Sequence, residues 1–75
     1  MAKSEPPVSL TAQIGEVAGA IWRLLDTEGP VSLAQLVKKL GEPRDIVMQG
    51  LGWLAREGKV QIEDVGRKRM VSLCG

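Results

Sequence analysis

The residues of this 75-residue chain form no recognisable catalytic arrangement. There is no histidine, which removes the commonest general base, the histidine of a catalytic triad and any histidine ligand for a metal. The single cysteine, Cys74, has no histidine to activate it, and the acidic residues are scattered in the way typical of solvated surface positions. We therefore expect a binding protein, not an enzyme, with no catalytic residue, no metal, no cofactor and no small-molecule ligand.

The clearest candidate for binding is a run of three cationic residues, Arg67, Lys68 and Arg69, directly after Gly66. The chain has a net charge of only +1, but residues 59–75 carry four cations and two carboxylates, a net charge of +2, against −1 for the rest. Three adjacent cations at a turn can neutralise phosphates and release counterions, which favours binding to a nucleic acid. The alternative is that they only keep an exposed hairpin soluble and prevent edge pairing.

A second candidate is the outward face of a helix predicted between Pro43 and about Glu57. That face would carry Arg44, Asp45, Met48, Gln49, Gly52 and Arg56. Arginine and glutamine side chains suit the edges of guanine and adenine. Because Asp45 and Glu57 cancel the charge of the two arginines, an ordinary solvated face explains the pattern as well as base recognition does. The residues that we predict to contact nucleic acid are Arg44, Met48, Gln49, Arg56, Arg67, Lys68 and Arg69.

Two further helices precede this one and must position it. Apolar residues recur at spacings of three and four over residues 11–28, and Gly29 then ends the helix. Ser32 and Gln35 have the spacing of a capping box, which predicts a second helix that stops at Gly41. The short glycine-containing connection to the third helix gives a helix-turn-helix unit.

After the third helix the apolar period changes to two, which predicts a β-hairpin. Val60 and Ile62 alternate with polar residues, a turn follows at Gly66, and Val71 and Leu73 form a second alternation. An isolated hairpin is only marginally stable, so it must pack on the helices.

The predicted order of elements is helix, short strand, helix, helix, strand, strand, in which Val31 supplies the short strand. This order is that of an α+β fold, the winged helix-turn-helix, with three helices and a C-terminal β-hairpin wing of two or three strands. We expect the domain to span residues 10–75, after a disordered tail at residues 1–9. Its core would hold Leu51 and Leu54, closed from the hairpin by Val60, Ile62, Val71 and Leu73.

Two runs of residues carry a resemblance to a known family. They are IGEVAG from Ile14 to Gly19, followed by Trp22, and LGWLAREGKV from Leu51 to Val60. Between Ile14 and Leu73 the chain resembles a family of small bacterial winged helix-turn-helix proteins catalogued as a domain of unknown function. The resemblance implies this fold and a bacterial origin, but no catalytic residue and no established ligand. More generally, a winged helix resembles DNA-binding domains whose third helix enters the major groove while the wing touches the backbone.

Four glycines inside the predicted helices call for an explanation. Gly15 and Gly19 lie one turn apart in the first helix, and Gly50 and Gly52 lie in the third. Each costs about 1 kcal/mol relative to alanine, a cost that close backbone approach usually offsets. The simplest interpretation is tight packing within the chain, with a tryptophan filling a groove left by glycine; the alternative is a contact between two copies.

Trp22 and Trp53, the only aromatic residues, lie on the flanks of the apolar stripes of their helices. We favour a core position for both, because so small a chain needs their volume. The alternative is a protein interface, as in a homodimer, where exposed tryptophans are often decisive for binding.

Two functions remain open. The first is binding to a nucleic acid, with DNA as the expected partner, in transcription regulation or chromosome association; the basic wing favours it. The second is a protein-interaction or homodimerisation module that keeps the fold without binding DNA; the neutral third helix favours it. No stretch approaches the roughly 20 apolar residues of a membrane span, so we expect a cytoplasmic protein with no membrane partner.

Overall fold

The computed structural model describes residues 9–74, and within them it confirms the α+β winged helix-turn-helix. The expected tail therefore lies, except for Ser9, outside the described residues. No helix within residues 9–74 is long and apolar enough to cross a membrane. The elements, in chain order, are α1 (Leu10–Glu28), β1 (Val31–Ser32), α2 (Leu33–Leu40), α3 (Arg44–Arg56), β2 (Val60–Val65) and β3 (Lys68–Leu73).

The capping box predicted for the second helix is present. The Gln35 backbone N–H donates to Ser32 Oγ, and the Ser32 N–H donates to Gln35 Oε1, each over 3.2 Å. Gly41, at a φ of 69°, ends α2 in the left-handed conformation that glycine adopts without steric cost. At the next helix Pro43 is the N-cap, so α3 begins at Arg44, one residue later than predicted, and it ends at Arg56. The turn between α2 and α3 is thus as short as the sequence indicated.

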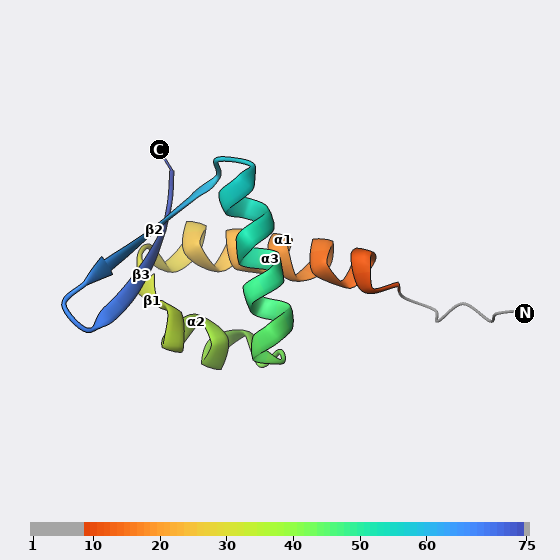
Figure 1. The fold of residues 1–75 in the computed structure, drawn as a ribbon, viewed down its shortest axis with the longest axis horizontal. Coiled ribbons are helices and arrows are strands. Elements are labelled where there is room, and N and C mark those ends of the chain that lie inside the picture. The colour runs from red at the N-terminus through yellow and green to blue at the C-terminus, as the bar shows by residue number, and fades with distance from the viewer. Residues whose placement is uncertain (1–8, 75) are drawn as a thin grey trace, which may run out of the picture.

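The three strands form one antiparallel sheet in the order β1-β3-β2. Val31 pairs with Val71 across β1 and β3, and Ile62 pairs with Val71 across β2 and β3, so these residues share one face. The two longer strands form the wing, which projects from the helices on the side away from the start of α1 (Figure 1). The sheet therefore connects the wing to the helical core through β1 and the inner end of β3.

Helix α3 lies across α1 (Figure 1), and the two helices are in close contact at Gly50. A Cβ atom placed on Gly50 would lie 3.1 Å from the Ala18 backbone nitrogen and 3.2 Å from Val17 Cγ1. The interpretation of Gly50 as a residue that allows close backbone approach is therefore confirmed. Leu51 and Leu54 are buried beside it, as predicted.

The hairpin closes the core over a shorter length than predicted. Val60 and Val71 are buried, but Leu73 is half-buried and Ile62 is 39% exposed. The prediction for Ile62 was wrong because β2 is an outer strand of the sheet, so Ile62 lies at the sheet edge while its partner Val71 on the central strand β3 is fully buried. Ile46 of α3, which was not predicted, is buried instead.

The predicted packing of the remaining glycines and of the tryptophans was also wrong. A Cβ on Gly15 or Gly52 would meet nothing within 4 Å, and one on Gly19 would meet only the end of the Arg23 side chain, at 3.5 Å. Trp22 is 40% exposed and Trp53 is 56% exposed, so neither is a core residue. The core of residues 9–74 is filled by aliphatic side chains alone.

Candidate nucleic-acid interface

The wing turn places Arg67 at its apex. Val65 pairs with Lys68, so only Gly66 and Arg67 form the loop. Gly66 has a φ of 63°, and no non-glycine residue among those described has a positive φ. This is the pattern of a type II′ turn, which requires glycine at its first central position and matches the twist of the two strands. The sequence Gly66-Arg67-Lys68-Arg69 thus fixes a tight tip that carries three cations.

One of these cations has a partner in the wing. Asp64 and Arg69 face each other across β2 and β3, and Arg69 Nε donates to Asp64 Oδ1 over 2.9 Å. The hydrogen bond from Arg69 and its positive charge lower the pKa of the Asp64 carboxyl. The same hydrogen bond and the negative charge of Asp64 raise the pKa of the Arg69 guanidinium. Both side chains are exposed, at 52% for Arg69 and 69% for Asp64, so solvent screens the pair. Arg69 is therefore already partly neutralised, whereas Arg67 and Lys68 form no ion pair with any residue between 9 and 74.

The wing tip and the start of α3 line a common hollow of about 400 Å³. Its lining consists of Leu33, Arg44, Asp64, Gly66, Arg67, Lys68 and Arg69. Four cations and one carboxylate give this hollow a net charge of +3, although the whole chain carries only +1. The rest of the chain therefore carries a net charge of −2, and the positive potential is concentrated at the hollow.

The outward face of α3 continues from this hollow. Arg44, Met48, Gly52 and Arg56 recur every four residues along the helix, and all four are exposed, as is Gln49 beside them. Arg56 lies 12 positions from Arg44, about 18 Å along the helix axis. The structure thus brings Arg44 together with the wing cations, and it does not bring Arg56 to them.

The acidic residue at the start of α3 is held by the helix itself. The Ile46 backbone N–H donates to Asp45 Oδ1 over 2.9 Å. This carboxylate lies in the first turn, where the helix dipole stabilises negative charge. Asp45 does not line the hollow formed with the wing, so its negative charge does not offset that of Arg44 there.

Two features of this interface were missed from the sequence. The Asp64–Arg69 pair follows once the turn is known to have two residues, because the register then sets each cross-strand partner. The approach of Arg44 to the wing depends on how the hairpin packs on the helices, and no local sequence pattern predicts this packing.

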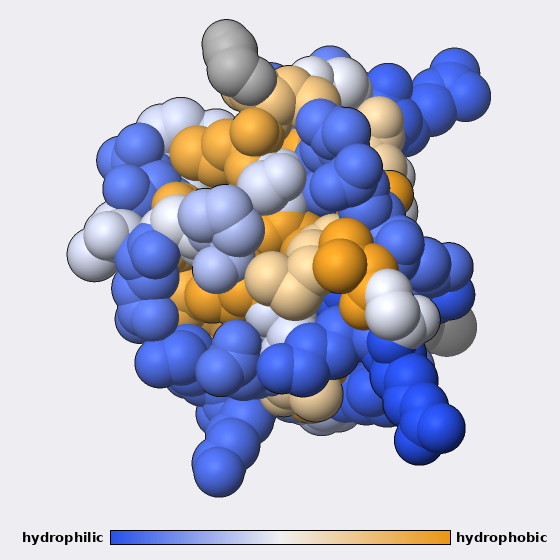
Figure 2. Space-filling view, turned by 90° about the vertical axis from the view of Figure 1, so that its left-hand side faces the viewer, coloured by the Kyte–Doolittle hydropathy of each residue, from blue (hydrophilic) through white to orange (hydrophobic). Residues whose placement is uncertain are grey.

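Apolar residues interrupt the charged surface around the wing. Ile62 and Val65 are 39% and 56% exposed. Viewed from the wing side, the surface shows hydrophobic residues between hydrophilic ones (Figure 2). The apolar side chains therefore limit the extent of the charged surface at the wing.

Comparison with known proteins places this fold in a family. The winged helix-turn-helix domain family DUF2582 matches residues 9–73. The chain belongs to this family. An uncharacterized protein of the archaeon Methanocaldococcus jannaschii is 41% identical over 64 residues, which cover 81% of this chain and 90% of that protein. This relative is archaeal, so it does not test the expected bacterial origin of the present chain, which stays a prediction.

Two solved structures share the fold. The first is described as giving structural insight into the DNA recognition and protein interaction domains of HOP2 and into homologous DNA pairing. It has a TM-score of 0.63 and 27% identity, and the match covers 77% of this chain and 98% of that chain. The second, HlyU from Vibrio cholerae N16961, has a TM-score of 0.66 and 22% identity, over 88% of this chain and 73% of that one, and shows the fold alone.

Proposed function

We propose that this domain binds duplex DNA through the wing and the start of α3, in a transcription-regulatory or chromosome-associated role in the cytoplasm. The observation that carries the proposal is the hollow in which Arg44, Arg67, Lys68 and Arg69 surround the single carboxylate of Asp64. The HOP2 structure supports it, because a DNA recognition domain is described for that protein and the fold is shared.

In this proposal the wing supplies most of the affinity. Arg67 and Lys68 are exposed and have no carboxylate partner in the described chain, so they can contact phosphates without first breaking an ion pair. Arg69 contributes less, because it must leave Asp64 or share it. Each phosphate neutralised releases counterions, so the affinity falls steeply with salt.

Helix α3 would add a modest contribution from its outward face. Arg44 and Gln49 have the donors and acceptors that read guanine and adenine edges, and Met48 is 37% exposed beside them. Gly52 has no side chain in the middle of this face, and a Cβ there would meet nothing within 4 Å. The DNA backbone or a base edge can therefore approach α3 closely at this point.

A salt series of fluorescence anisotropy with a labelled random duplex tests the proposal. For Arg67→Ala/Lys68→Ala we expect the slope of log affinity against log salt to flatten by about 2 for each bound copy. Lys38→Ala/Lys39→Ala removes the same charge from α2 and serves as the matched control, with a smaller expected change. Equal slopes for the wing variant and wild type would contradict the wing mechanism.

A second variant changes affinity in the opposite direction. Asp64→Asn removes the carboxylate that holds Arg69, so the hollow gains a unit of positive charge and we expect tighter binding with a slope steeper by up to about 1. If wild type shows no salt-dependent binding to DNA at all, the proposal is wrong and the alternative of a protein-interaction module is favoured.

A further inference from the structure

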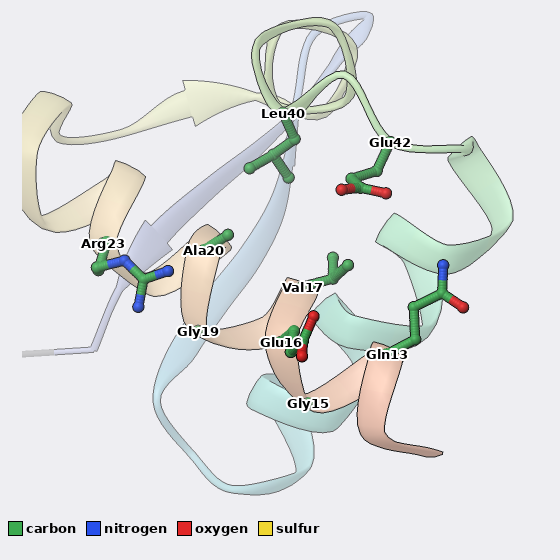
Figure 3. Close-up of a pocket in the computed structure, with 9 residues that line it drawn as sticks. All are labelled: Gln13, Gly15, Glu16, Val17, Gly19, Ala20, Arg23, Leu40 and Glu42. Atoms are coloured by element: carbon green, nitrogen blue, oxygen red, sulfur yellow. The ribbon is translucent and has the colours of Figure 1, made fainter. Parts of the chain in front are cut away.

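On the exposed side of α1, Gly15 and Gly19 form a ridge without side chains between two hollows. Gly15 and Gly19 line both hollows. The first hollow, of about 720 Å³, is also lined by Glu16, and Arg23 lines both hollows. Glu16 and Arg23 project on either side of Gly19 along the helix (Figure 3). The second, of about 690 Å³, contains Trp22 and Trp53. Both aromatic residues of the chain thus face solvent on one side of this ridge.

We propose that this face of α1 is the interface of a homodimer in which the two α1 helices cross antiparallel about Gly19. In an isologous two-fold interface each contact occurs twice, because residue i meets residue j of the copy and residue j meets residue i. An interface of this kind therefore requires a surface that is complementary to itself. The positions of four residues on α1 meet this requirement.

The apolar side of the ridge is self-complementary in shape. Trp22 lies three positions after Gly19 and Gly15 lies four positions before it, and both line the tryptophan hollow. When two α1 helices run antiparallel about Gly19, Trp22 of each copy therefore lies over Gly15 of the other. A Cβ on Gly15 would meet nothing within 4 Å, so no side chain beside that position blocks the approach of an indole ring.

The polar side of the ridge is self-complementary in charge. Glu16 lies three positions before Gly19 and Arg23 four positions after it, and both line the first hollow. The same antiparallel arrangement sets Glu16 of each copy beside Arg23 of the other. A parallel arrangement would instead bring the tryptophan side of one copy against the polar side of the other.

The exposed area of the two tryptophans is also large enough to form a substantial part of a dimer interface. At about 250 Å² for a tryptophan, the exposed fractions of 40% and 56% sum to about 240 Å² per copy. That is close to a third of the ~800 Å² that each partner buries in a standard interface. Tryptophans at the centre of an interface contribute disproportionately to affinity.

Self-association would leave the proposed DNA interface free. The wing hollow shares no lining residue with either hollow beside α1. The dimer is therefore tested without DNA, and its failure would not bear on DNA binding.

Sedimentation equilibrium of the full chain, from tens of micromolar to about 1 mM, measures the association. We expect Gly19→Met to weaken the dimer about tenfold or more, because the added side chain stands on the crossing point. The variant still folds, since a Cβ at Gly19 meets only the mobile end of Arg23 at 3.5 Å. Gly52→Met is the matched control: Gly52 is an exposed mid-helix glycine on α3 with nothing within 4 Å of its Cβ position, and its variant should dimerise like wild type.

A charge exchange tests the antiparallel orientation. Glu16→Arg and Arg23→Glu should each weaken the dimer, and the double variant should recover most of the loss because the pairing is restored with opposite signs. A wild type that stays monomeric up to about 1 mM would overturn the proposal, and the face would then belong to another protein or to residues 1–8. A dimer that Gly19→Met leaves unchanged would also overturn it.

Discussion

Replacing Gly50 by alanine should destabilise the domain, although alanine is the better helix former. Gly50 lies where α3 crosses α1, and an added Cβ would lie 3.1 Å from the Ala18 nitrogen, 3.2 Å from Val17 Cγ1 and 3.4 Å from the Ile14 carbonyl oxygen. Two of these atoms belong to the backbone of α1, which cannot rotate away as a side chain does. The two helices must therefore move apart by a few tenths of an ångström along their contact.

The magnitude follows from two opposing effects. Overpacking of a tight contact costs about 1–3 kcal/mol. The gain in helix propensity returns about 1 kcal/mol, so the net loss of unfolding free energy is about 0–2 kcal/mol. Gly52→Ala has the same gain and no contact within 4 Å, so it should stabilise the domain and isolates the steric effect.

Thermal and urea unfolding followed by far-UV circular dichroism would compare the two variants. The difference in unfolding free energy between them should equal the steric cost, and each 1 kcal/mol corresponds to about 4–8 °C in a domain of this size. If Gly50→Ala proves as stable as Gly52→Ala, the close approach of α1 and α3 is wrong.

Three further predictions concern stability and ionisation. Leu54→Ala should lower the free energy of unfolding by about 2–5 kcal/mol because it opens a cavity beside α1. A urea midpoint equal to that of wild type would show that the core face of α3 is misassigned. Ser32→Ala should cost about 1 kcal/mol through the loss of the capping box with Gln35, again measured by urea unfolding. Because Arg69 lowers the pKa of Asp64 below its ordinary value of 3.8, the pair contributes stability above that pH and loses it as the pH falls through the lowered pKa. An NMR titration of the Asp64 carboxyl should therefore show its pKa rising towards 3.8 in Arg69→Ala, and an unchanged value would contradict the ion pair.

The local features of the fold were predictable because their causes are local. A capping box needs only two side chains three residues apart, and Ser32 and Gln35 form it as expected. The change from a helical period to a period of two located the wing, and Gly66 located its turn. Each of these signals lies within a few residues of the feature that it determines.

The extent of the core was less predictable, because it depends on where elements distant in sequence stop covering one another. Alternation correctly placed Ile62 on the same face as Val71, but it could not show that β2 would be an outer strand of the sheet and leave Ile62 exposed. In the same way, the volume argument that favoured a core position for Trp22 and Trp53 failed because aliphatic residues already fill the space. No local pattern separates Gly50, whose Cβ position meets the α1 backbone, from Gly15, Gly19 and Gly52, whose Cβ positions do not.

The two proposed surfaces together make one more prediction, since a two-fold dimer would present two wings to the same duplex. With about three phosphate contacts per copy, from Arg44, Arg67 and Lys68, the salt slope of the dimer should be about twice the ~2.7 of a monomer. Gly19→Met keeps every one of these cations, yet it should halve the slope because it separates the copies. Arg67→Ala/Lys68→Ala should lower the slope and leave the sedimentation of the free protein unchanged. A Gly19→Met variant that is monomeric and retains the full slope would mean that one copy binds DNA alone, and that the α1 interface serves another purpose.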